Sequence, residues 1–283
     1  MTHVLITGAG SYIGMHIARQ LALSPERFTV RELDLQGSFS AADFAGVDAV
    51  VHVAGIAHQK ETAQNAPLYQ QVNCDLALQT AQLAKAQGVK QFVFFSSMSV
   101  YGLTTGRITA DTPPRPTTHY GSSKLAAEEA LAALQDGSFR IAVLRPPMIY
   151  GRGCRGNYPR LAALACSLPC FPKGKNERSM LYIGTLCAFV QRLLESGEGG
   201  LYFPQNSAYV NTGDMVRRIA ACHGRKLRLV PGFGWLLDAA AKRVGVAGKV
   251  FGTLTYDQRM SAAFRDEAEL SFDETIRRTE VGE

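Results

Sequence analysis

The sequence lacks any apolar run of about 18 residues, the length that a transmembrane helix needs. It also lacks the basic stretch and long apolar segment of a secretory signal, because a short strand-like segment already begins at Val4. We therefore expect a cytoplasmic protein without stable membrane insertion.

Cysteine is sparse, with six residues scattered over 283, and no pair has the C-x-x-C spacing. No Cys/His set has the spacing of a zinc site, so we expect reduced thiols and no metal. Positive charge is not concentrated either. The net charge is only +6, without a Lys/Arg run or a basic-aromatic stripe. This composition argues against nucleic-acid binding and suits an anionic small-molecule substrate.

Strand-like and helix-like segments alternate over residues 1–150, which predicts an α/β fold with a parallel sheet covered on both faces. The expected strands are 4–7, 28–35, 48–53, 91–95 and 141–145, and the clearest helices are 67–88 and 120–134. The character changes after Gly151. Residues 151–283 therefore form a second expected region, with helices at 157–168, 184–195 and 212–223.

The sheet is expected to be shortened around its second and third strands. A doubly wound fold normally places another strand and helix between 28–35 and 48–53, but residues 36–47 are too few for both. Asp34 at the end of the second strand is consequently ambiguous. It holds an adenosine ribose, lies beside the adenine, or simply ends the strand, and the sequence leaves all three interpretations open.

A glycine-rich segment joins the first strand to the first helix. Small residues there let the backbone approach phosphates, which then lie at the amino end of a helix. The small residues that leave the 48–53 strand indicate a second close approach of backbone to a cofactor. The expected contacts are Gly8, Gly10, Ser11, Tyr12, Ile13 and Gly14 in the turn, and Val53, Ala54 and Gly55 after the later strand.

Tyr120 and Lys124 are four residues apart, so on a helix they share one face. A nearby ammonium group favours the phenolate and lowers the pKa of a tyrosine. Ser97 follows the 91–95 strand, where open α/β sheets bind ligands, and its hydroxyl can bond the same substrate oxygen. Together the three predict proton transfer at an alcohol or carbonyl while a cofactor moves a hydride.

These motifs jointly resemble the extended short-chain dehydrogenases/reductases, and more narrowly the NAD-dependent epimerase/dehydratase family that acts on sugar nucleotides. The resemblance rests on T-G-x-x-x-x-x-G at 7–14, His-Val-Ala at 52–54, S-S-x-x-x-Y-G at 96–102, Y-x-x-x-K at 120–124, Arg-Pro at 145–146 and R-x-x-x-Y-I at 178–183. It covers nearly the whole chain.

The resemblance implies a Rossmann-like NAD(P)-binding domain over 1–150 and a smaller, mainly substrate-binding domain over 151–283, with some segments returning to the Rossmann sheet. NAD is slightly favoured over NADP, and Pro147 joins the cofactor contacts. Tyr120 is implied as the acid/base, with Lys124 on the nicotinamide ribose and Ser97 on the reacting oxygen. The implied substrate contacts are Ser99, Asn157 and Arg178. The family also implies a homodimer.

Three departures from the family pattern matter. Ser11 replaces the middle glycine of the turn, and the shortened sheet leaves the choice between NAD and NADP open. Met98 and Ser99 occupy the places where 4,6-dehydratases of this family carry an Asp-Glu pair. Neither residue can serve as that acid or base, so we expect no 4,6-dehydratase activity.

The leading hypothesis is therefore a sugar-nucleotide (UDP-hexose type) 4-epimerase that works by transient 4-keto oxidation. One alternative is a 4-ketoreductase of a deoxysugar nucleotide in cell-surface polysaccharide synthesis. A second is an epimerase of a polyprenyl-diphosphate sugar with peripheral membrane contact, suggested by Phe233, Trp235, Leu236 and Leu237 beside Lys242 and Arg243. A non-catalytic dinucleotide sensor is the remaining alternative, although such proteins commonly lose the Tyr or the Lys.

Overall fold

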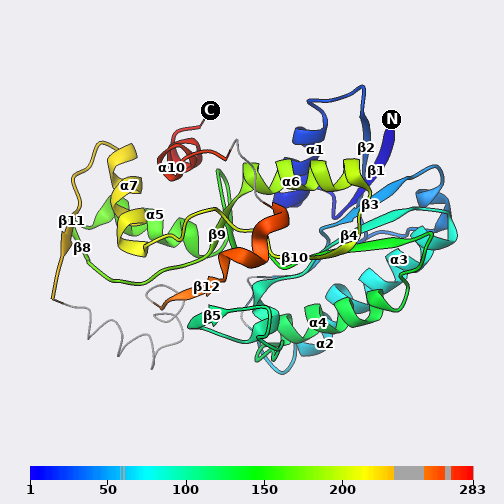
Figure 1. Ribbon diagram of the computed structural model, residues 1–283, viewed down its shortest axis with the longest axis horizontal. Helices are drawn as coiled ribbons and strands as arrows, with labels where there is room; N and C mark the ends of the chain where they lie inside the picture. The colour runs from blue at the N-terminus through cyan, green and yellow to red at the C-terminus, as the bar shows by residue number, and fades with distance from the viewer. Residues whose placement is uncertain (58, 60, 233–251, 265–268, 283) are drawn as a thin grey trace. The chain divides into compact units, whose positions relative to one another are not determined.

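The computed structural model describes residues 1–57, 59, 61–232, 252–264 and 269–282 (Figure 1). The aromatic-basic segment that contains Phe233 and Trp235 lies outside these residues. The chain divides into two compact units. Unit 1 comprises residues 1–102, 113–146 and 186–204, and unit 2 comprises 103–112, 147–185 and 205–283. Within the described residues, no helix combines the length and apolar character needed to cross a membrane.

Unit 1 is built on a six-stranded parallel sheet with the order β10-β6-β4-β3-β1-β2. The strands are β1 (Thr2–Thr7), β2 (Phe28–Leu33), β3 (Ala49–His52), β4 (Gln91–Phe95), β6 (Arg140–Leu144) and β10 (Gly200–Tyr202). The sheet runs outward from β1 in both directions, to β2 on one side and to β3 on the other. This reversal is the switch point at which open α/β sheets bind ligands.

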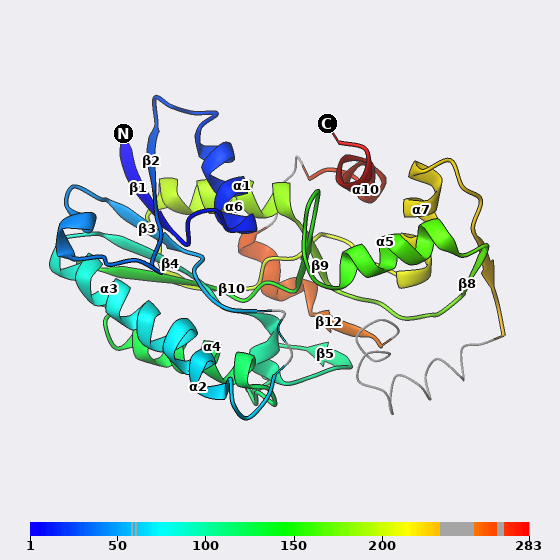
Figure 2. The same ribbon diagram turned by 180° about the vertical axis from the view of Figure 1, so that it is seen from behind.

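Helices cover both faces of this sheet. Figure 1 shows α1 (Tyr12–Leu21) and α6 (Ile183–Ser196) over one face. Seen from behind in Figure 2, α2 (Ala66–Gln70), α3 (Leu76–Ala86) and α4 (His119–Ala132) cover the other. The core between sheet and helices is apolar; it includes Leu5, Val50, Phe92, Phe94, Ala81, Leu131 and Phe139. The predicted α/β fold with a doubly wound parallel sheet is confirmed.

The sheet is shortened as predicted. Between β2 and β3 the chain forms only a 3-10 turn, Ala41–Phe44, whose Phe44 is buried in the core. A Ser40/Asp43 capping box starts this turn. No third strand is inserted there, and β2 is therefore the edge strand of the sheet.

The predicted helix 67–88 is not one regular helix. It begins as α2, passes through a π-helical turn (Gln71–Asp75) and continues as α3. Gly88 follows its end with φ +81°, a left-handed conformation that glycine adopts readily. Two further 3-10 turns are Met98–Tyr101, directly after β4, and Gln258–Phe264 in unit 2.

Unit 2 consists of short strands and helices. The strands are β5 (Gly106–Ile108), β7 (Met148–Tyr150), β8 (Cys170–Pro172), β9 (Met180–Tyr182), β11 (Arg228–Val230) and β12 (Leu254–Tyr256), which pair as β12-β5, β7-β9 and β11-β8. Among its described residues, the α-helices are α5 (Asn157–Ser167), α7 (Thr212–Cys222) and α10 (Phe272–Glu280). Stacked tyrosines form part of its core, with the rings of Tyr150 and Tyr158 5.6 Å apart.

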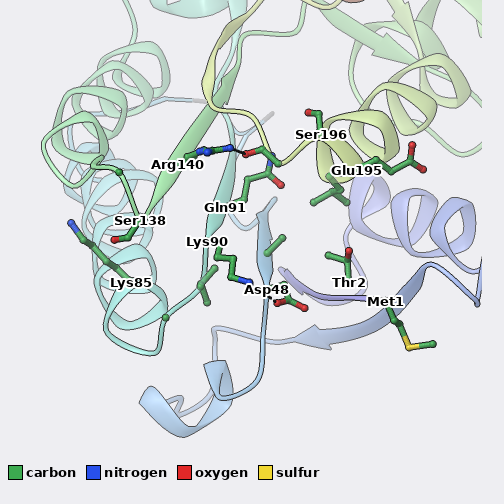
Figure 3. A pocket seen from close by; sticks show the side chains of 16 residues that line it. Met1, Thr2, Asp48, Lys85, Lys90, Gln91, Ser138, Arg140, Glu195 and Ser196 are labelled. Atoms are coloured by element: carbon green, nitrogen blue, oxygen red, sulfur yellow. Dashed lines mark hydrogen bonds and ion pairs between the residues drawn. The ribbon is translucent and has the colours of Figure 1, made fainter.

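A pocket of about 700 Å³ opens in unit 1 at the amino ends of the strands (Figure 3). Thr2, Ala49, Gln91 and Arg140, each at or beside the start of a strand, help to line it. The sequence motifs follow the opposite, carboxyl ends of β1, β3 and β4. This pocket is therefore distinct from the candidate active site.

Candidate active site

The glycine turn after β1 has the geometry of a phosphate cradle. Gly8 and Gly10 have φ values of +95° and +71°, which favour glycine. A Cβ on Gly8 would lie 2.8 Å from the Ala54 backbone nitrogen, so the turn is closely packed against the loop after β3. The turn leads directly into the amino end of α1, where backbone N–H groups and the helix dipole favour an anion.

Ser11, which replaces a family glycine, has a structural role. It is the N-cap of α1, and its hydroxyl accepts a hydrogen bond from the Gly14 N–H at 3.2 Å. A Cβ on Gly14 would lie 2.7 Å from that hydroxyl oxygen and 3.2 Å from side-chain carbons of Ile6 and Val53. Gly14 is therefore required for close helix–sheet packing, and the turn fits a dinucleotide pyrophosphate despite the serine.

Two carboxylates lie near the end of β2. Asp34 is exposed, follows the last residue of the strand, and accepts a hydrogen bond from the Gln36 N–H at 2.9 Å. Glu32, which sequence analysis did not single out, accepts a hydrogen bond from the Gly10 N–H at 3.3 Å. Its contact with the turn places a second acid beside the expected adenosine side of the site.

Tyr120 is in the first turn of α4 and is partly buried. Burial raises its pKa, whereas a hydrogen bond with Ser97 acts in the opposite direction. This differs from the lowered pKa that the Tyr-Lys spacing predicts. The Tyr69 ring packs edge-on against the Tyr120 ring at 6.5 Å and contributes to the raised pKa.

Ser97 is the N-cap of the 3-10 turn that follows β4. Its hydroxyl accepts a hydrogen bond from the Ser99 N–H at 3.1 Å and donates to the Ser99 hydroxyl at 3.2 Å. The Met98 N–H donates to the Pro146 carbonyl at 2.9 Å. The Ser96 N–H donates to the Leu144 carbonyl at 2.8 Å, so backbone hydrogen bonds fix the residues on both sides of Ser97.

Lys124 lies one helical turn after Tyr120 and is only 4% exposed. Its ammonium group donates to the Phe95 carbonyl at 2.8 Å and lies 4.7 Å from the centre of the Phe94 ring. Burial lowers the pKa of Lys124 to about 8, and the negative charge of Glu128 opposes this shift. The end of β4 therefore anchors Lys124, and the Ser97 turn starts from the same end of this strand.

Asn73 connects the π-helical turn to the loop after β3. Its amide oxygen accepts from the Ile56 N–H at 2.8 Å, and its amide nitrogen donates to the Ile56 carbonyl and the Ser123 hydroxyl, both at 3.1 Å. This buried asparagine thereby fixes the loop that contains Gly55. A Cβ on Gly55 would lie 2.8 Å from the Asn73 oxygen and 3.3 Å from the Lys124 nitrogen.

Glu61 caps α4 and was missed by sequence analysis. Its two carboxylate oxygens accept hydrogen bonds from the N–H groups of His119 and Tyr120, at 2.8 and 3.1 Å. Carboxylates are favourable at a helix amino end because they satisfy N–H groups and complement the helix dipole. No local sequence motif indicates this role, because Glu61 lies 59 positions before Tyr120.

Three predicted site residues belong to unit 2, whereas Tyr12 and Ile13 begin α1 in unit 1. Pro147 is the first residue of unit 2 after β6, and Asn157 is the first residue of α5. Arg178 precedes β9, and its guanidinium donates to the Gly252 carbonyl at 2.8 Å. Burial lowers the pKa of Arg178 to about 10, so the group stays cationic at neutral pH.

The parallel sheet, the glycine turn after β1 and the helix that carries Tyr120 and Lys124 are the features on which the resemblance to the extended short-chain dehydrogenases/reductases rests. A model of the NAD dependent epimerase/dehydratase family matches residues 4–203, which is most of the chain. The chain therefore belongs to the NAD-dependent epimerase/dehydratase family.

Two curated relatives are similar over most of their length. A UDP-glucose 4-epimerase of Vibrio cholerae is 26% identical over 285 residues, covering 90% of this chain and 87% of the relative. An N-acetyl-alpha-D-glucosaminyl-diphospho-ditrans,octacis-undecaprenol 4-epimerase of Escherichia coli O157:H7 is 28% identical over 248 residues, covering 80% and 73%.

Solved structures agree on the fold. The UDP-glucuronic acid 4-epimerase of Bacillus cereus in complex with NAD superposes with a TM-score of 0.78 at 18% identity, covering 99% of this chain and 96% of that one. A dTDP-4-dehydrorhamnose reductase with NADP and an NDP-hexosamine 5,6-dehydratase share the fold, with TM-scores of 0.74 and 0.73. The fold thus accommodates epimerases, reductases and dehydratases.

Proposed function

We propose that this protein is a sugar-nucleotide 4-epimerase of the UDP-hexose type. The observation that carries the proposal is Tyr120 with buried Lys124 one helical turn away on α4, Ser97 near enough to act on the pKa of Tyr120, and the glycine turn in the same unit. The names of both curated relatives, each a 4-epimerase, support the choice of reaction.

Each side chain has a defined task in this proposal. Tyr120 takes the proton from the sugar 4-hydroxyl at its phenolic oxygen and later returns one to the 4-keto oxygen. Ser97 bonds the same sugar oxygen and keeps it within reach of Tyr120. The Lys124 ammonium favours the phenolate and binds the nicotinamide ribose. NAD held by the 8–14 turn and residues 53–55 would supply the reversible hydride transfer at carbon 4 that the inversion needs.

The cofactor is held by unit 1 in this proposal. Backbone of the 8–14 turn and the amino end of α1 receive the pyrophosphate, and residues 53–55 pass beside the nicotinamide half. NAD suits the β2 end better than NADP, since carboxylates at Glu32 and Asp34 repel a 2′-phosphate. We further propose that Pro147 completes the cofactor contacts.

Unit 2 binds the substrate in this proposal. The Arg178 guanidinium is buried yet cationic, and its planar fork matches a diphosphate. Asn157 stands at the amino end of α5, where N–H groups favour an anion. Ser99, bonded to Ser97, contacts the sugar.

We do not propose 4,6-dehydratase activity. That reaction needs an acid and a base beside the Ser97 turn, and Met98 and Ser99 offer neither. A second candidate substrate is a sugar on a polyprenyl diphosphate, which the 28% identity to the undecaprenol-linked 4-epimerase favours. The same residues would carry out the same chemistry, and only the group beyond the diphosphate would differ.

The test is to incubate purified protein with UDP-glucose, UDP-N-acetylglucosamine and a short-chain polyprenyl-diphosphate sugar, and to follow carbon-4 inversion by proton NMR. We expect a C4 epimer without added cofactor, and about one NAD per chain released on denaturation. Tyr120→Phe should lower kcat by about 10²- to 10⁴-fold while NAD remains bound. Inversion at undiminished rate in Tyr120→Phe would refute the assignment, and NADPH consumption with a 4-keto sugar would indicate a ketoreductase.

We also propose that the protein is a homodimer, by analogy with the family. Sedimentation velocity at micromolar concentration tests this, and a monomeric species over the whole concentration range would contradict it.

A further inference from the structure

Four side chains form a buried polar network behind the Ser97 turn. Glu128 and Arg145 are only 8% and 6% exposed. The Arg145 Nε donates to both Glu128 carboxylate oxygens at 3.0 and 3.1 Å, and its Nη2 donates to one of them at 2.5 Å. The Ser96 hydroxyl also donates to Glu128, and the Arg145 Nη1 donates to the Tyr101 hydroxyl at 2.8 Å.

The network joins the segments that carry the site. Ser96 follows β4 immediately before Ser97, and Tyr101 closes the 3-10 turn that Ser97 opens. Glu128 lies one helical turn after Lys124 on α4, and Arg145 follows β6. The Arg145 guanidinium also lies 5.1 Å from the centre of the Tyr101 ring. Both ends of the Ser97 turn are therefore attached to the helix of Tyr120 and Lys124.

Stability alone is a poor reason to keep this pair. Removing two charges from water is costly, and apolar residues of similar volume are often as stable or more so. A bidentate Arg-carboxylate pair, however, permits one geometry only. The pair is thus better suited to fixing positions than to holding the fold together.

We propose that Glu128 and Arg145 are positioning residues, which set Ser97 and Lys124 relative to Tyr120. This inference rests on the proposed function, because it assumes that these three residues carry out proton transfer. It assigns no contact with substrate or cofactor to Glu128 or Arg145.

The charge of Lys124 gives the proposal a distinctive readout. Among the described residues, the other ionisable groups on elements packed against α4 or acting on Lys124 are His52, Tyr69, Cys74, Asp75, Lys85, Tyr101, Arg140 and Arg145. His52 is neutral at working pH, because burial lowers its pKa to about 3. Apart from burial, the charge that shifts the pKa of Lys124 is that of Glu128, which raises it. Removing this charge lets Lys124 lose its proton at lower pH.

The experiment compares Glu128→Gln with Glu129→Gln, an exposed neighbour on the same helix. We measure kcat and KM for the sugar nucleotide from pH 6 to 10, NADH binding by fluorescence over the same range, and thermal unfolding. Glu128→Gln should lower kcat at least about tenfold with little change in KM, as expected for misplaced catalytic groups. In Glu128→Gln, the decline of kcat and of NADH binding at alkaline pH should begin at a lower pH than in wild type. Glu129→Gln should match wild type.

Tyr101→Phe keeps the ion pair and removes one hydroxyl, so it tests positioning even where Glu128→Gln fails to fold. It should lower kcat without moving the alkaline limb. The inference is overturned if every variant that folds matches Glu129→Gln, both in kcat and in the pH at which kcat declines on the alkaline side. The variants compared are Tyr101→Phe and, where it folds, Glu128→Gln. Wild-type protein that binds NADH but converts no sugar substrate would instead overturn the proposed function, and the binding limb of Glu128→Gln would still report on Lys124.

Discussion

Gly55 occupies a position where a single added methyl group should disturb the candidate site. A Cβ there would lie 2.8 Å from the Asn73 amide oxygen and 3.3 Å from the Lys124 nitrogen. The oxygen cannot retreat freely, because it accepts the Ile56 N–H at 2.8 Å, and the Asn73 amide nitrogen is bonded to Ile56 and Ser123. Gly55→Ala therefore forces Asn73, the loop or Lys124 to move.

The expected cost follows from the bond at risk. Breaking the Asn73–Ile56 hydrogen bond leaves a buried polar group unsatisfied, which costs about 1–3 kcal/mol. If the disturbance falls on the loop that receives the nicotinamide half, NADH affinity should fall about 5- to 150-fold, since about 1.4 kcal/mol is tenfold. Any displacement of Lys124 adds a decrease in kcat.

Fluorescence titration with NADH measures this loss, and thermal unfolding measures the accompanying change in stability. Gly137→Ala is the matched control, because a Cβ on Gly137 meets nothing within 4 Å. NADH affinity and kcat in Gly55→Ala equal to those of Gly137→Ala would refute the argument that this loop, Asn73 and Lys124 form one closely packed part of the site.

Three further predictions concern other parts of the site. Glu61→Ala should destabilise the start of α4 by about 0.5–2 kcal/mol, as for lost helix caps, and lower kcat more than NADH affinity; equal kcat in variant and wild type would contradict a role for this cap. The rate should fall as pH rises above about 8, because Lys124 then loses its proton and with it the positive charge that favours the Tyr120 phenolate. A kcat that stays level to pH 10 would contradict this. Arg178→Lys should raise KM for a sugar nucleotide about tenfold with little effect on kcat, since lysine lacks the planar fork for a diphosphate, and steady-state kinetics with unchanged KM would remove Arg178 from the substrate contacts.

Much of unit 1 was predictable because its signals are local. The apolar strands, the glycine turn and the Tyr120–Lys124 spacing each lie within a few residues, and counting the residues between β2 and β3 sufficed to predict a shortened sheet. The turn of Ser97 was equally accessible, since it follows the end of a recognisable strand.

The contacts that hold the site together were not predictable in this way. Glu61 caps α4 across 58 positions, and Glu128 and Arg145 meet across 17. Neither pair has a periodic pattern or a motif, because their pairing depends on how sheet and helix pack. The direction of the Tyr120 pKa was missed for the same reason: burial, which the spacing does not report, outweighs the effect expected of a nearby cation.

The π-helical turn at residues 71–75 has a consequence for how this helix can vary. An α-helix advances about 100° per residue, so a π turn shifts the residues before it out of phase with those after it. Asn73, within the turn, is thereby aimed at the loop of Ile56 while Ala77, Ala81 and Ala84 beyond it still face the sheet. Deleting one residue here would yield a more regular helix that satisfies either the core or the loop, but not both. The irregular turn lets one helix serve two differently oriented surfaces.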